Sequence, residues 1–134
     1  MQMNHTELTT LAVKMLADYD GHTPGTAFAN GLRLSVQEAW HLQTMVSELR
    51  QRRGERVVGF KVGAVCEGNQ KLIGLDHPAW GRLWENEQHP DGATLYKKNF
   101  ANPSMEAEFG IILNRDIEAD KTSLEDVLLA IESV

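Results

Sequence analysis

Apolar residues recur at helical spacing in two stretches near the start of the chain. The first stretch covers residues 8–19 and follows Asn4 and Glu7, which have the spacing of a capping pair. The second follows Ser35 and Glu38, which have the same spacing, and ends at a glycine. Residues three and four apart share one face of a helix, so each stretch predicts an amphipathic helix.

The apolar period changes from helical to two in residues 56–63, which predicts a strand. Valine and phenylalanine occupy one face, while Lys61 lies on the other face between Gly59 and Gly63. A solvent-exposed lysine on a strand is common and needs no special role. A lysine between two residues without side chains is also well placed to meet a ligand, because another molecule can approach closely there. The spacing alone leaves both interpretations open.

A second period of two runs through residues 105–113 and predicts another strand. Its odd positions are apolar, while Glu106, Glu108 and Gly110 share the other face. The two glutamates would lie about 6.5 to 7 Å apart at Cα, close enough to bind one hard cation together. The alternative is a half-buried strand with a solvated acidic face.

The remaining segments are read from turn residues and short apolar runs. Residues 66–75 are expected to form a loop with a helical turn, and Asp76 lies in the turn that follows, where aspartate usually bonds the backbone. Residues 80–87 are expected to form a short strand. Thr122 or Ser123 is expected to cap a third helix. The apolar stripe of that helix would be Leu124, Val127, Leu128 and Ile131.

Composition narrows the function. The 134 residues are 42% hydrophobic and 24% charged, as in a water-soluble globular domain. The net charge of -6 argues against a nucleic-acid partner or an anionic membrane surface. The arginines at 50, 52, 53 and 56 are interpreted as cations at a helix C-terminus. Cys66 is the only cysteine, and no leader or membrane-spanning run is visible, so we expect a cytoplasmic protein.

Four segments, in order, resemble one enzyme family. They are residues 34–43 (LSVQEAWHLQ), 53–63 (RGERVVGFKVG), 73–83 (IGLDHPAWGRL) and 105–117 (MEAEFGIILNRDI). These are similar to the 2-keto-4-pentenoate hydratases and the 4-oxalocrotonate decarboxylases of the fumarylacetoacetate hydrolase superfamily. Four segments in the family's order are far more specific than a single Glu-x-Glu.

The resemblance implies a Mg²⁺ or Mn²⁺ site with Glu106 and Glu108 as its first two ligands. It also implies that Lys61 is the active-site lysine and that Asp76 is an acidic residue near the same pocket. Lys61 would anchor the substrate carboxylate or move a proton, and the sequence does not choose between these roles. The family's third ligand would fall shortly after Val134. Glu132, expected in the last turn of the third helix, is a further candidate within the chain.

The implied activity is hydration of 2-hydroxy-2,4-dienoates in the breakdown of aromatic compounds, by a hydro-lyase that is a homo-oligomer. The implied fold is α+β, with residues 1–100 as an N-terminal α+β region. Residues 101–134 would begin a metal-binding β fold that is incomplete, because family members are much longer. Decarboxylation of a 2-oxo-3-enedioate is one alternative. A non-catalytic, shortened relative that acts as an interaction module is another.

Overall fold

The chain contains helices and short antiparallel strands, in agreement with the predicted α+β class. The structure is a computed structural model that describes residues 3–118 and 122–134. Residues 1–103 form one compact unit and residues 104–134 form another. None of the described helices is both long enough and apolar enough to cross a membrane.

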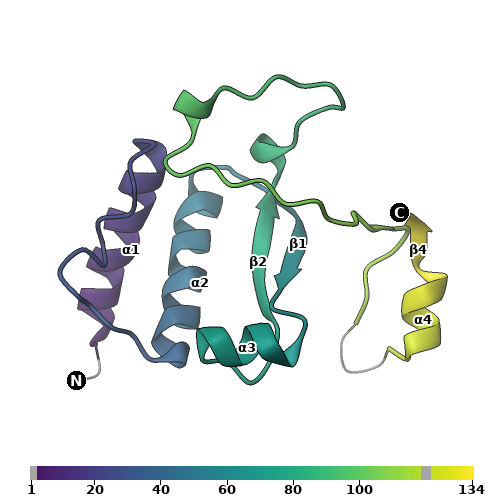
Figure 1. The fold of residues 1–134 in the computed structure, drawn as a ribbon, viewed down its shortest axis with the longest axis horizontal. Coiled ribbons are helices and arrows are strands. Elements are labelled where there is room, and N and C mark those ends of the chain that lie inside the picture. The colour runs from purple at the N-terminus through teal and green to yellow at the C-terminus, as the bar shows by residue number, and fades with distance from the viewer. Residues whose placement is uncertain (1–2, 119–121) are drawn as a thin grey trace. The chain divides into compact units, whose positions relative to one another are not determined.

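The first unit begins with the two predicted helices, α1 (His5–Asp20) and α2 (Val36–Arg52), which lie side by side (Figure 1). Both predicted capping pairs are formed, from Asn4 and Glu7 for α1 and from Ser35 and Glu38 for α2. In each pair, the side chain of one residue accepts a hydrogen bond from the backbone N–H of the other. These N–H groups have no acceptor within the helix. The core between the helices is made of Leu8, Leu11, Ala12 and Leu42.

Glu38 joins the starting ends of the two helices. Besides capping α2, its carboxylate accepts a 2.6 Å hydrogen bond from the backbone N–H of Met3, next to the start of α1. Hydrogen bonds from the Ser35 side chain, then from the Met3 and Ser35 backbones, lower the pKa of Glu38 to about 2. The two helices therefore start at the same end of the unit.

Strands β1 (Val57–Gly63) and β2 (Ala79–Trp84) form an antiparallel hairpin beside α2 (Figure 1). Residues directly opposite one another share a face of the sheet, so Phe60 and Arg82 lie on one face and Lys61 and Gly81 on the other. The face with Arg82 is turned to α2, because the Arg82 Nη1 lies 3.2 Å from the Gln43 Oε1. A bulge between Val57 and Gly59 interrupts the pairing near the start of β1.

The connection between the strands differs from its prediction. Helix α3 (Glu67–Ile73) is longer than the expected helical turn and ends at Gly74, whose φ of 73° favours glycine. The strand predicted at residues 80–87 stops at Trp84, because the chain turns into the 3-10 helix η1 (Glu85–Glu87). A second 3-10 helix, η2 (Lys97–Asn99), interrupts the segment that leads out of the first unit.

The second unit corrects the prediction of a strand over residues 105–113. Only β3 (Ile112–Leu113) forms, and it pairs with β4 (Ile131–Ser133), a strand that the sequence did not predict. A strand needs a partner for its backbone N–H and C=O groups, and β4 offers one only to this short stretch. In residues 105–111 the apolar side chains are instead exposed, with Met105 at 95% and Phe109 at 90%.

The predicted third helix is confirmed as α4 (Leu124–Leu129), and Ser123 rather than Thr122 caps it. The Ser123 hydroxyl accepts a hydrogen bond from the backbone N–H of Asp126, and the Asp126 carboxylate accepts one from the backbone N–H of Ser123. The helix is shorter than its predicted apolar stripe, because Ile131 pairs with Leu113 in β4. Glu132 is therefore in a strand and not in a helical turn.

Candidate functional site

Lys61 lies on an unusually bare surface of the hairpin. Gly59 and Gly63 flank it along β1, and Gly81 is directly opposite it on β2. A Cβ atom added to Gly63 or Gly81 would meet no atom within 4 Å, whereas one added to Gly59 would lie 3.6 Å from the Leu83 side chain. The side chain of Lys61 is exposed to solvent, beside these glycines.

Asp76 lies in the bend between α3 and β2, in the same unit as Lys61. Its side chain is 98% exposed, and its Oδ1 lies 3.8 Å from the Nε2 of His77. The bend leads directly into β2, where Ala79 pairs with Gly63, two residues after Lys61. Asp76 therefore lies just outside the hairpin, next to the end formed by Gly63 and Ala79.

Glu106 and Glu108 belong to the second unit, and both are exposed. The segment around them is not a strand, so the alternation that predicted two carboxylates on one face does not apply to it. Their assignment as metal ligands now depends on the resemblance and on their chemistry. Carboxylate oxygens remain the donors that Mg²⁺ and Mn²⁺ prefer, and Glu106 and Glu108 supply two of them.

Glu132 is the candidate third carboxylate within the chain. It lies in β4, whose partner β3 begins at Ile112, four residues after Glu108. The pairing of Ile112 with Ser133 thus places Glu132 near the C-terminal end of the segment that carries Glu106 and Glu108. Across residues 3–118 and 122–134, no group of three His, Cys, Asp or Glu side chains could hold a metal ion. The donors present fit a hard cation in kind but supply only part of its ligand shell.

Sequence reasoning missed a buried ionic cluster around Arg50. The sequence was interpreted as placing Arg50 among several cations at a helix end. Its side chain is instead only 8% exposed, and its Nη2 lies 2.5 Å from the Glu55 Oε2 and 2.6 Å from the Glu87 Oε1. Its guanidinium also lies over the rings of Tyr19 and Trp84. The available signal was weak: Arg50 lies on the same helical face as Val46 and would have pointed inward.

The sequence of the chain has clear relatives, although no family model matches it. It is 35% identical over 92 residues to a 2-keto-4-pentenoate hydratase from Burkholderia vietnamiensis, which covers 69% of the chain and 35% of the relative. It is 30% identical over 101 residues to a 4-oxalocrotonate decarboxylase from a Pseudomonas species, covering 75% of the chain and 39% of the relative. The chain is related to this hydratase and decarboxylase family. Further bacterial relatives at 31% identity are also named as hydratases.

The fold agrees with this family. The chain matches 4-oxalocrotonate decarboxylase from Pseudomonas putida G7, solved in complex with magnesium and adipate, with a TM-score of 0.83 and 21% identity. The match covers 97% of the chain and 50% of the decarboxylase. The chain thus has the fold of about half of that family member, and it spans between about a third and a half of the relatives that it matches.

In the first unit, the pairing of β1 with β2 fixes the backbone position of one predicted site residue, Lys61. Lys61 places a cation among Gly59, Gly63 and Gly81, and Leu83 and Ala79 lie further along the same face. The exposed side chain of Lys61 extends from this fixed point on the strand.

Proposed function

We propose that the chain is part of a metal-dependent hydratase that adds water to 2-hydroxy-2,4-dienoates, in the breakdown of aromatic compounds. The observation that carries this proposal is Lys61 on its glycine-lined face, in a chain whose sequence relatives are mostly named as hydratases. The substrate would be a small 2-oxo or 2-hydroxydienoate acid, and the enzyme would be a hydro-lyase.

Lys61 has the role of meeting the negative charge of the substrate. Its ammonium group would either hold the carboxylate of the dienoate or give a proton to the reacting carbon chain, and an exposed lysine beside glycines suits both actions. Asp76, on the exposed bend before β2, would act near the same pocket as a proton acceptor or as a partner that orients a substrate hydroxyl. The two residues would supply the positive and the negative group of the first unit.

Glu106 and Glu108 would hold a Mg²⁺ or Mn²⁺ ion, since their oxygens suit a hard cation. Bound there, the cation supplies Lewis acidity toward the substrate's carboxylate and neighbouring oxygen. The magnesium in the decarboxylase of similar fold supports this choice of metal. Further ligands would come from Glu132, from the remaining part of the family fold, or from a second copy in a homo-oligomer.

A direct assay tests this function. The chain would be joined to the C-terminal part of a 2-keto-4-pentenoate hydratase relative, and loss of the ultraviolet absorbance of a 2-hydroxydienoate would be followed with Mg²⁺ present. We expect turnover that Lys61→Ala and Glu106→Gln each reduce by about a hundredfold or more, while Lys71→Ala on exposed α3 leaves it unchanged. Absence of turnover in a folded, joined chain would refute the proposal.

Decarboxylation of a 2-oxo-3-enedioate is the second candidate reaction, favoured by the TM-score of 0.83 to a decarboxylase. The same residues would serve it, because both reactions draw negative charge toward the oxygens at the acid end of the substrate. Release of CO₂ from the enedioate, measured beside the hydration assay on the same joined protein, distinguishes them. Faster turnover of the enedioate would make the decarboxylase the correct assignment.

The exposed apolar side chains of residues 105–111 favour a third possibility, an interaction module without catalysis. Met105 and Phe109 are almost fully exposed, and such surfaces often pair with another chain. Light scattering on the purified chain tests this directly. A monomer at all concentrations would argue against an assembly role, whereas a stable oligomer without turnover would favour it.

A further inference from the structure

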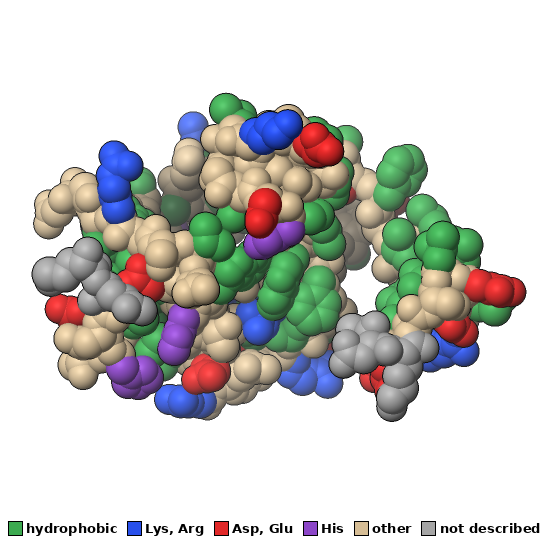
Figure 2. Space-filling view, turned by 90° about the horizontal axis from the view of Figure 1, so that it is seen from below, with side chains coloured by type: hydrophobic (Ala, Val, Ile, Leu, Met, Phe, Trp, Pro, Cys, Tyr) green, Lys and Arg blue, Asp and Glu red, His purple; other side chains and the backbone are tan. Residues whose placement is uncertain are grey.

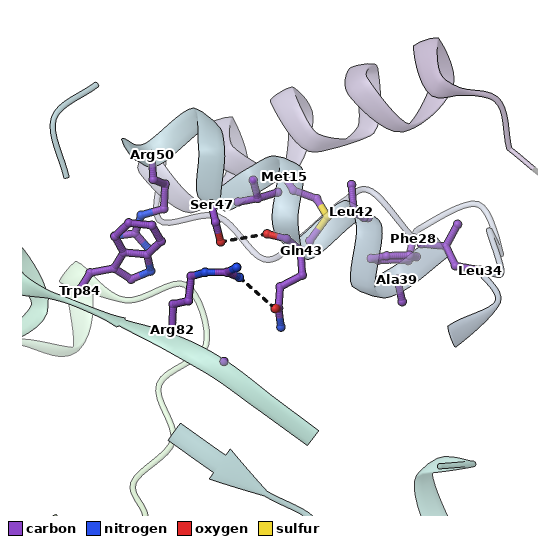
Figure 3. Close-up of a pocket in the computed structure, with 12 residues that line it drawn as sticks. Met15, Phe28, Leu34, Ala39, Leu42, Gln43, Ser47, Arg50, Arg82 and Trp84 are labelled. Atoms are coloured by element: carbon purple, nitrogen blue, oxygen red, sulfur yellow. Dashed lines mark hydrogen bonds between the residues drawn. The ribbon is translucent and has the colours of Figure 1, made fainter. Parts of the chain in front are cut away.

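A cavity of about 360 Å³ lies between α2 and β2, and nothing in the proposed reaction uses it. Its wall is largely apolar, formed by Met15, Phe28, Leu34, Ala39, Leu42 and Val46. Figure 3 shows Phe28, Leu34 and Ala39 at one end of the cavity and Arg82, Arg50 and Trp84 at the other. The volume falls within the range of small-molecule sites, which combine apolar walls with a few polar groups.

The polar end carries a cation, Arg82, that no described carboxylate neutralises. Arg50 is matched by Glu55 and Glu87. Arg82, in contrast, makes no ion pair among the described residues, and only its Nη1 has a hydrogen-bond partner, the Gln43 Oε1 at 3.2 Å. Among the residues that the structure describes, no Asp or Glu lines the cavity. Arg82 thus offers further N–H donors and an unneutralised charge to a molecule in the cavity.

The guanidinium of Arg82 is held in place before any ligand arrives. The Gln43 amide donates a 2.9 Å hydrogen bond to the Trp80 backbone carbonyl, which turns its oxygen toward Arg82. The ring of Trp80 lies 5.1 Å from the guanidinium carbon and supports it from the side. A fixed planar cation of this kind recognises a carboxylate with two parallel hydrogen bonds.

The side chains that line this cavity from β2 lie on the other face of the sheet from Lys61, and Gly81 lines the cavity with backbone atoms only. Side chains alternate between the two faces of a strand, so Arg82 and Trp84 point to the face opposite Gly81 and its partner Lys61. Figure 3 shows Arg82 rising from β2 toward α2. Figure 2 shows hydrophobic side chains gathered in the middle of the view from below. In the first unit, successive aromatic rings are in contact, in the order His77, Trp40, Trp80 and Phe60.

We propose that the cavity between α2 and β2 binds a small organic monocarboxylate with an apolar body. Its carboxylate pairs with Arg82, and its alkyl or aryl part lies along α2 toward Phe28 and Leu34. A neutral molecule of the same shape loses the pairing with Arg82, and an inorganic anion gains nothing from the apolar wall. The site therefore selects molecules that carry both parts, and this selection does not depend on the proposed hydratase reaction.

Titration calorimetry on the unmodified 134-residue chain, without metal, tests the proposal. Octanoate and 4-propylbenzoate represent the alkyl and aryl forms of the ligand, and octan-1-ol is the neutral control. We expect saturable binding of at least one acid, with octanol at least about tenfold weaker. Equal affinities for octanoate and octanol, or no saturable binding of either acid up to millimolar concentration, would overturn the proposal.

Variants locate the binding. Arg82→Gln should weaken octanoate binding at least about tenfold and leave octanol unchanged, while Ala39→Trp should weaken both by filling the apolar end. Arg52→Gln, which removes an exposed cation from the same helix, should bind as the unmodified chain does. Unchanged octanoate binding in folded Arg82→Gln protein would overturn the proposal. If that variant does not fold, the comparison of acid and alcohol on the unmodified chain remains decisive.

Discussion

Lys61 of β1 lies directly opposite Gly81 of β2, so the lysine has glycine on both sides along its own strand and across the hairpin. Three positions that would normally carry side chains around a strand residue are therefore empty. The face was predicted in part from β1, but the glycine across the hairpin becomes visible only when the register of the two strands is known. This relationship gives the first prediction.

Replacing Gly81 with valine should restrict Lys61 without damaging the fold. The added side chain meets open space, and a β-branched residue suits a strand, so the free energy of unfolding should change by no more than about 1 kcal/mol. The rate at which an acylating reagent modifies Lys61, followed by mass spectrometry with Lys14 as reference, should fall several-fold. Gly25→Val is the control, since its added side chain also meets open space. An unchanged rate at Lys61 would show that the bare face does not govern its access.

Millimolar Mg²⁺ or Mn²⁺ should stabilise the second unit modestly. Two carboxylates give weak binding, so at a tenfold excess over the dissociation constant the gain is about 1.4 kcal/mol. Glu106→Gln and Glu108→Gln should each abolish the effect, and Lys61→Ala should leave it nearly intact because the lysine is no ligand. Electron paramagnetic resonance of Mn²⁺ measures the binding directly. Glu125→Gln on α4 is the matched control, and loss of binding in that variant would place the metal elsewhere.

The Glu38 carboxylate should make the first unit less stable in acid. Its pKa is lowered from 4.5 to about 2, so its contribution is fully present above pH 4.5 and is lost as the pH falls toward 2. Glu38→Gln should therefore destabilise the protein at neutral pH, and the difference from the unmodified chain should shrink across this window. Urea unfolding at a series of pH values measures it. Glu48→Gln, at an exposed ion pair on α2, should have little effect at any pH. A Glu38→Gln difference that is constant with pH would contradict the assignment.

Arg50→Met should destabilise the first unit by about 2 kcal/mol, because it removes the buried cation that Glu55 and Glu87 share and leaves Glu55 with Arg53 alone. It also removes the cation that lies between the rings of Tyr19 and Trp84. Arg52→Met, two residues later on the same helix, should change stability by less than about 0.5 kcal/mol, since the Arg52 side chain is 73% exposed. Chemical denaturation of both variants checks the contrast, and similar losses in the two would show that the Arg50 cluster contributes little.

The sequence by itself determined the elements whose causes are local. Helices α1 and α2 begin at the predicted capping residues, because a cap joins groups only three residues apart and the apolar stripe repeats within each helix. Strand β1 follows from alternation within a short run of residues. The family relationship was also visible in short ordered segments, with Lys61, Asp76, Glu106 and Glu108 among them.

Only the tertiary structure decided features that join distant residues. Ile112 pairs with Ser133 in a described strand while residues 105–111 belong to no strand, so alternation alone predicted too long a strand. Arg50 meets Glu87, which is 37 residues away, and Lys61 meets Gly81 across the hairpin. Sequence patterns report which groups need partners. Which partner each group receives depends on strand register and on how helices pack, and these are properties of the folded chain.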